Sequence, residues 1–422
     1  MMDSLKLLRG LLFFFWLSLF TSQSVMDAAA SLLFIYAVVR LIQHPEERRA
    51  LWAKFRSSRL AHLCVGWLLV VAVGIFVVAG SEVGIGREQW RNFLEFRWML
   101  ELGLWIYLLS LIRLDERDGA WIVAPPLVTA VFGLLAWVMN ASPLHPGEAV
   151  GRVGGFFNNP MPFAHTMGPV AAGFAAAWLV IWKERRTPAW GFLLIALVLN
   201  LSVLLSMTRG IWIGILAAAL VLPPLLWKKR GWILSLSVVV TGVLLAFSVP
   251  VLRDRVTEAF DPSRSYDGQR VVLWQTNWRM FLDHPIFGVG YSENRRHLRE
   301  YYDRMNLPTD QFESHAHNQY LHFLSGTGAL GLLCYVLFLG SFLVLNWRLV
   351  RRPTGILFED ALAACLLAAQ ITFYVGSVTE SNFSISKNRY LILFVLALVA
   401  ALKVWRQRRQ SDAAHFRRGS DF

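Results

Sequence analysis

Long apolar segments alternate with short polar connections along almost the whole chain. A bilayer core of about 30 Å is crossed by about 20 apolar helical residues. Segments that approach this length lie near residues 8–23, 26–43, 61–80, 95–112, 119–139, 162–182, 188–207, 210–227, 231–250, 318–345, 359–377 and 389–405. The pattern therefore predicts an all-α polytopic membrane protein with about twelve transmembrane helices.

One long polar stretch, residues 251–317, interrupts this pattern. It holds nine arginines, ten carboxylates and four histidines, and a hydrophobic segment resumes directly after it. The apolar side chains that recur within it at helical spacing are Val271, Trp274, Trp278 and Phe281. This spacing predicts an amphipathic helix at the membrane interface, and a second helix is expected over 292–305.

The pattern divides the chain into four regions. Residues 1–139 hold the first five predicted spans, and residues 140–250 hold the next four together with an outer loop at 140–161. Residues 251–317 form the polar loop, and residues 318–422 hold the last three spans and a tail. A cleaved signal peptide is the alternative for the first segment. Since no small-x-small cleavage motif follows it closely, we interpret it as a spanning helix.

Composition supports the membrane assignment. Of the 422 residues, 56% are hydrophobic and only 16% are charged, which fits poorly with a soluble enzyme of this length. The net charge of +13 does not indicate nucleic-acid binding, because the basic residues form short scattered clusters rather than one face. All three cysteines fall within apolar segments, so we expect neither a disulfide nor a cysteine metal site.

The distribution of basic residues predicts the orientation. With the N-terminus in the cytoplasm, 25 lysines and arginines lie inside and 16 outside. Nine of those sixteen belong to the long loop 251–317, which is too long to follow the positive-inside rule. We therefore expect both termini in the cytoplasm and the long loop on the outer side of the membrane, which is the periplasm if the cell is Gram-negative.

Two histidines stand at the end of this loop. His317 lies at the start of a predicted span, where unpaired backbone N–H groups and the helix dipole favour a neutral imidazole that can accept a proton. An interfacial or helix-capping role is the equal alternative. His315 shares the turn, and either histidine could be the base. Two single carboxylates nearby, Glu313 and Glu380, are more typical of salt-bridge partners.

Several basic residues are predicted on the same side of the membrane. A lone arginine at the edge of a span more often reaches lipid phosphate, whereas converging guanidinium groups can bind a diphosphate. The candidates for such binding are Arg209, Arg270, Arg152, Lys387 and Arg389. No Asp-x-Asp motif stands in an outer loop, so we expect no metal and no other cofactor.

The run from Gly326 to Gly331 matches G-x-G-x-x-G. It lies within an apolar span with no preceding strand, so a dinucleotide site is excluded by context. Small residues that allow close packing in the membrane are the better explanation.

An ordered set of motifs is present between residues 150 and 340. It comprises Thr208-Arg209-Gly210, Arg270 with Trp274, Asp283-His284-Pro285, Gly288-Val289-Gly290, and His317-Asn318 followed by Leu321 and the glycine run. In order and spacing this set resembles the O-antigen ligase and polymerase superfamily. The resemblance implies a metal-independent GT-C-type membrane glycosyltransferase in which Arg209, Arg270 and His317 are essential.

For the ligase branch, the resemblance implies transfer of O-antigen from undecaprenyl diphosphate to lipid A-core, without nucleic acid and in contact with membrane lipid. Within the superfamily, an O-antigen polymerase or a protein O-oligosaccharyltransferase is the nearest alternative. From another class, a lipid-linked glycan transporter would bind the same diphosphate without making a bond. The oligomeric state stays open.

Overall fold

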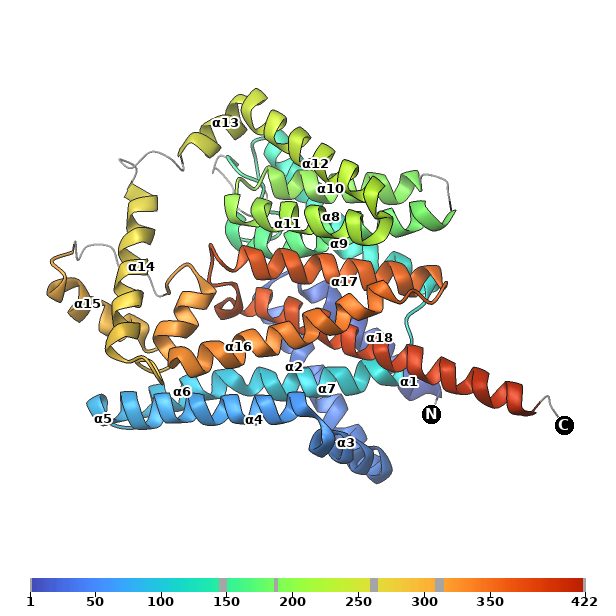
Figure 1. Ribbon diagram of the computed structural model, residues 1–422, viewed down its shortest axis with the longest axis horizontal. Coiled ribbons are helices and arrows are strands. Elements are labelled where there is room, and N and C mark those ends of the chain that lie inside the picture. Colours follow the sequence, from blue (N-terminus) through green and yellow to red (C-terminus); the bar gives the residue numbers. More distant parts are fainter. Residues whose placement is uncertain are drawn as a thin grey trace.

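The computed structural model describes residues 2–142, 144, 150–185, 189–258, 265–307 and 315–419, with only the backbone of 2, 3, 82, 83, 265–269 and 413–419. Every regular element in this part of the chain is a helix, which confirms the predicted all-α class (Figure 1).

Nine helices in the described residues are long and apolar enough to cross a bilayer. They are α2 (Gln23–Gln43), α4 (Arg59–Ala72) with its π-helical extension η1 (Val73–Ala79), α8 (Gly119–Val138), α9 (Pro160–Arg185), α11 (Arg209–Trp227), α12 (Lys229–Ser248), α16 (Gln319–Arg351), α17 (Leu357–Gly376) and α18 (Ser386–Gly419). The remaining predicted spans correspond to the shorter helices α1 (Met2–Ser18), α7 (Trp98–Leu111) and α10 (Trp190–Leu204). The chain is a multi-pass membrane protein, and the count of twelve crossings stays a prediction.

Short helices fill the connections. They are α3 (Pro45–Ser57), α5 (Gly80–Val83), α6 (Arg87–Leu94), and the 3₁₀ turns η2 (Glu95–Arg97), η3 (Glu116–Asp118) and η5 (Asn382–Ser384). The sequence pattern assigned α3 to a polar connection. It is helical because Pro45 and two glutamates open it and basic residues close it, which complements the helix dipole.

The core of the molecule is formed by α9, α17 and α18. Of the residues in the most apolar stretch of each helix, 89%, 67% and 83% are buried, whereas the share in α12 is 11%. At Gly173 the α9 backbone comes close to Cys365 of α17, because glycine leaves no side chain between the two helices. These buried helices therefore hold the loops at their ends in place, including the loop 377–385 between α17 and α18.

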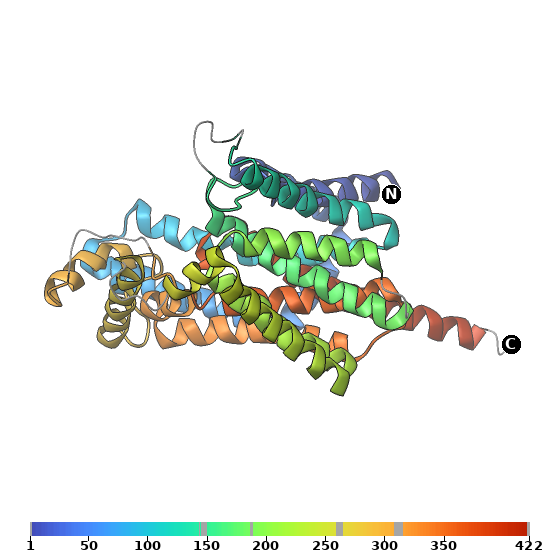
Figure 2. The ribbon, with the colours of Figure 1, turned by 90° about the horizontal axis from the view of Figure 1, so that it is seen from above.

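The described part of the long polar loop is largely helical, and the two helices predicted there correspond to α14 and α15 below. It contains α13 (Pro250–Thr257), α14 (Ser265–Asp283) and α15 (Asn294–Arg304). Helix α14 crosses the end of the bundle, and both chain termini lie at the opposite end (Figures 1 and 2). Two termini at one end agree with an even number of crossings.

Helix α16 is broken at Gly328, which has φ 66° and ψ −171°. The turn after α14 enters this break: Ala329 N donates to Pro285 O at 2.8 Å, and Val289 N donates to Ser325 O at 2.9 Å. The glycine run therefore allows a close approach, as predicted, but the segment that approaches is a loop rather than another helix. These backbone bonds attach α14 firmly to α16.

Candidate active site

The candidate site lies at the end of the bundle that α14 covers. The elements that build it are the start of α11, helix α14, the turn 315–318 before α16, and the loop 377–385 between α17 and α18. Residue 313 lies outside the described residues. The segments are far apart in sequence, so only tertiary packing brings them together.

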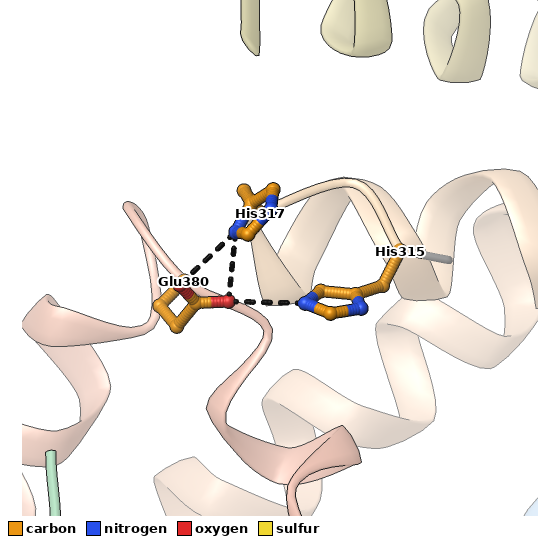
Figure 3. Close-up of side chains that lie close together, drawn as sticks. All are labelled: His315, His317 and Glu380. Atoms are coloured by element: carbon orange, nitrogen blue, oxygen red, sulfur yellow. Dashed lines mark hydrogen bonds and ion pairs between the residues drawn. The ribbon is translucent and has the colours of Figure 1, made fainter. Parts of the chain in front are cut away.

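The loop 377–385 carries Glu380, which is 1% exposed and lies between two histidines (Figure 3). His317 Nδ1 is 3.0 Å from both carboxylate oxygens, and His315 Nε2 is 3.3 Å from Oε1. A carboxylate only accepts hydrogen bonds, so in this arrangement His317 donates from Nδ1. Its Nε2 atom then keeps a lone pair that can accept a proton.

The charge of Glu380 follows from these contacts. Burial raises the pKa of a carboxyl group, but the hydrogen bonds from His315 and His317 more than offset this effect, and the pKa of Glu380 is lowered overall. Glu380 is therefore a carboxylate at neutral pH. Its negative charge opposes the positive field that the start of α16 exerts on the His317 ring.

The turn that carries the histidines is anchored on both sides. His317 has φ 45°, which is uncommon for a residue other than glycine, and Asn318 caps α16 by accepting from Leu321 N at 3.0 Å. Trp274 of α14 donates to Ala316 O at 3.0 Å. Gln319 N donates to Ser377 O at 2.8 Å. These bonds fix the His317 ring against Glu380.

Arg270 is brought into the same cluster by α14. Its guanidinium lies 4.0 Å from Glu380 Oε2, and the side chain is 19% exposed. A guanidinium, a carboxylate and two imidazoles thus meet at one point. Arg270 and His317 thus share Glu380 as a neighbour, and the role of either residue in catalysis stays a prediction.

Arg209 starts α11 beside the loop of Glu380. The next residue, Gly210, packs so closely on Thr379 that a Cβ atom there would collide with the threonine hydroxyl. Arg209 itself donates to Arg255 O at 3.4 Å. Arg152 donates to Ser206 O at 2.7 Å and to Thr208 Oγ1 at 3.0 Å, so it braces the turn that precedes Arg209.

The other two predicted diphosphate ligands have neighbours outside the cluster. Lys387 donates to the carbonyl of Thr21 and lies 4.1 Å from the centre of the Phe157 ring. Arg389 donates to Phe383 O at 3.2 Å and lines a separate pocket. Their assignment to the diphosphate stays a prediction.

His165 belongs to the site and was missed by sequence analysis. It is 1% exposed near the start of α9, and its charge interactions are with Glu380 and Arg270. Its Nδ1 atom has no hydrogen-bond partner within the described residues. An ionisable residue inside an apolar span is a signal of function, and this signal was present at His165.

The cluster also has the composition of a metal site. His315, His317 and Glu380 offer ligand atoms within 4.8 Å of one another, so they could hold a cation. Two imidazoles and a carboxylate are a known donor set for zinc. Against this, Arg270 brings a positive charge to the same carboxylate, which opposes a dication. The expected absence of a metal stays a prediction.

Comparison with known proteins supports the resemblance in the sequence. Residues 192–336, about a third of the chain, match the family described as O-antigen ligase. The matched region contains Arg209, Arg270, His315 and His317 but ends before Glu380. No curated protein matches the chain. The family match confirms the predicted relation to the O-antigen ligase and polymerase superfamily.

Proposed function

On the premise of this family match, we propose that the protein is an O-antigen ligase of the bacterial inner membrane. It transfers a glycan from undecaprenyl diphosphate to lipid A-core at the periplasmic face. The observation that carries the proposal is the pair formed by His317 and Glu380 with Arg270 beside it.

The proposed reaction is a single displacement. The acceptor hydroxyl gives its proton to His317 Nε2 while its oxygen bonds to the anomeric carbon of the donor glycan. The bond from that carbon to the diphosphate oxygen breaks, and undecaprenyl diphosphate leaves with the electron pair. Attack opposite the leaving group inverts the anomeric centre. Glu380 stabilises the imidazolium that forms, as a buried carboxylate does for a catalytic histidine.

The leaving diphosphate needs positive charge. We assign this role first to Arg270 and Arg209, because a guanidinium binds phosphate oxygens in bidentate fashion. Arg152, Lys387 and Arg389 stay candidates for the same role. With two guanidinium groups in place, the diphosphate can leave without a metal.

Three other functions are compatible with the family or the site. A polymerase or a protein O-oligosaccharyltransferase would use the same donor with another acceptor. A lipid-linked glycan transporter would bind the donor without breaking a bond. The buried carboxylate–histidine pair favours chemistry over transport, because binding alone requires no group that accepts a proton.

The test uses the full chain in nanodiscs with undecaprenyl-diphosphate O-antigen, lipid A-core and EDTA. We expect capped lipopolysaccharide from the wild type. For His317→Ala we expect a rate lower by a factor of about 100 or more, because a general base contributes roughly this factor or more. His315→Ala, measured in parallel, shows which histidine is the base. His44→Ala, which alters a half-buried histidine of the α2–α3 connection, is the control and should keep the wild-type rate.

Each alternative gives a different result in this assay. Full activity of His317→Ala contradicts the mechanism. Glycan lengthened on the lipid carrier indicates a polymerase, and glycan moved without a new bond indicates a transporter. Activity that disappears with EDTA and returns with added zinc indicates a metal at the three-residue cluster.

A further inference from the structure

A pocket lies next to the loop of Glu380 and takes no part in the proposed proton transfer. It has a volume of about 580 Å³ and is lined by Arg87, Trp90, Arg91, Leu94, Glu95, Arg97, Ser384, Ser386 and Arg389. Four arginines face one glutamate, which leaves an excess of three positive charges. Such a pocket favours an anion.

Arg389 makes this pocket more than an exposed basic patch. Its side chain is 7% exposed, and its Nη1 atom donates to Phe383 O at 3.2 Å. Its Nε atom has no hydrogen-bond partner among the described residues. A buried guanidinium N–H without an acceptor costs free energy, and an anionic oxygen in the pocket would supply the acceptor.

The neighbouring carboxylates leave some guanidinium N–H groups of the pocket available to a ligand. Arg91 is 3.6 Å from Glu88, and Arg97 is 3.3 Å from Glu101. Both arginines are more than half exposed, at 73% and 61% of the side chain. Since a guanidinium carries five N–H donors, each can bind a further oxygen.

Apolar side chains lie beside the arginines. Trp90 and Leu94 are one turn apart on α6 and are 53% and 57% exposed. Arg87 and Arg91 flank them on the same short helix. Tryptophan and arginine together on an amphipathic helix are typical of a segment at the membrane surface, where an apolar chain and an anionic headgroup meet.

We infer that this pocket binds the phosphate group of an anionic lipid. The arginines bind the phosphate oxygens, and Trp90 and Leu94 contact the adjoining acyl chain. If the proposed function holds, the phosphorylated lipid of the acceptor is the occupant. Ser384 and Glu380 belong to one short loop, so an acceptor anchored here would have its sugars close to His317.

The test measures retention of radiolabelled lipid A by the purified full chain in detergent. Arg87→Gln combined with Arg91→Gln should weaken binding about tenfold, because two charge-assisted phosphate contacts are lost. Arg295→Gln combined with Arg299→Gln removes the same charge at the same spacing from exposed positions of α15, and should leave binding unchanged. Arg389→Gln provides a second variant from another element and should also weaken binding.

Two further probes identify the phosphate source. Lipid A stripped of its phosphates should bind the wild type as weakly as lipid A binds the double variant. Phosphatidylglycerol that binds tenfold more weakly than lipid A supports the acceptor as occupant, and equal binding assigns the pocket to bulk anionic lipid. Unchanged binding by the Arg87 and Arg91 double variant, or undiminished binding of dephosphorylated lipid A, overturns the inference.

The transfer reaction provides a separate readout. His317→Ala should bind lipid A as the wild type does while losing transfer. If the wild type binds lipid A in an arginine-dependent way but shows no transfer, the inferred lipid-binding pocket is supported and the proposed function is contradicted.

Discussion

At the scale of single residues, the site depends on one buried carboxylate. Glu380 contacts His315, His317 and Arg270 within 4.0 Å and is almost inaccessible to solvent. Isolated buried charges are costly, so this carboxylate persists because its neighbours supply hydrogen bonds and positive charge. Its contacts orient the proposed base.

We expect Glu380→Gln to lower the transfer rate by about 100-fold, because an amide gives His317 no negative partner once the ring has taken up a proton. Initial rates of lipopolysaccharide capping in nanodiscs measure the effect. Glu300→Gln changes an exposed carboxylate of α15 and should keep the wild-type rate. An unchanged rate for Glu380→Gln would restrict this carboxylate to a structural role.

The same variant has a predicted pH signature. The pKa of Glu380 is lowered below its ordinary value of 4.5 in the folded protein. A lowered pKa stabilises the fold fully above the unfolded-state pKa, and this stabilisation is lost as the pH falls toward the folded-state pKa. As the pH is lowered below about 5, the midpoint temperature of thermal unfolding should therefore fall more steeply for the wild type than for Glu380→Gln. Parallel slopes would show that the carboxylate contributes no such stability.

At the scale of elements, the break in α16 decides where α14 lies. The turn 284–290 enters the break and bonds with the backbone on both sides of Gly328. Arg270 and Trp274 are both on α14, so the position of one helix sets two contacts of the site. Helix α14 is thereby attached to a spanning helix through backbone hydrogen bonds of the turn that follows it.

Gly328→Ala should destabilise the protein strongly. Its backbone conformation is nearly restricted to glycine, with a cost of about 1–3 kcal/mol for another residue, and a Cβ atom would also collide with the Ile286 carbonyl. Thermal unfolding in detergent measures the loss, and transfer should fall because α14 shifts. Gly340→Ala, on the same helix with no atom within 4 Å of the added Cβ, should be neutral. Equal midpoints for the two variants would contradict the role of the break.

At the scale of the whole molecule, the arrangement of helices separates two ends. One end carries α14, α15 and the site, and the other carries both termini (Figure 1). Outside the long loop, 25 basic residues are expected on the side of the termini and 7 on the other. This asymmetry predicts that the site faces the periplasm.

Cysteine labelling tests this orientation. In a background without Cys64, Cys334 and Cys365, a cysteine introduced by Arg299→Cys should react with a membrane-impermeant maleimide in spheroplasts. One introduced by Lys229→Cys, exposed at the start of α12, should react only after lysis. The reverse pattern would invert the topology and exclude a periplasmic reaction.

The sequence by itself determined the class of the protein and the position of its long apolar helices, and it nominated several candidate site residues. Within a bilayer, the backbone N–H and C=O groups of an apolar segment must hydrogen-bond to each other, which a helix achieves. The length of an apolar segment alone therefore predicts a helix. His317, Arg270 and Arg209 could be proposed from the sequence because local motifs carry them. The polar helix α3 was missed because no hydrophobic pattern marks it.

Only the tertiary structure decided which of these residues meet. Glu380 looked ordinary along the chain, and His165 carried only the general signal of an ionisable residue in an apolar span. The significance of both depends on neighbours 63 and more residues away. Lys387 and Arg389 were predicted in one group with Arg270, yet they contact other partners. Charge interactions act over a few ångströms in space, and the distance between two charges in a folded chain is set by packing rather than by sequence separation.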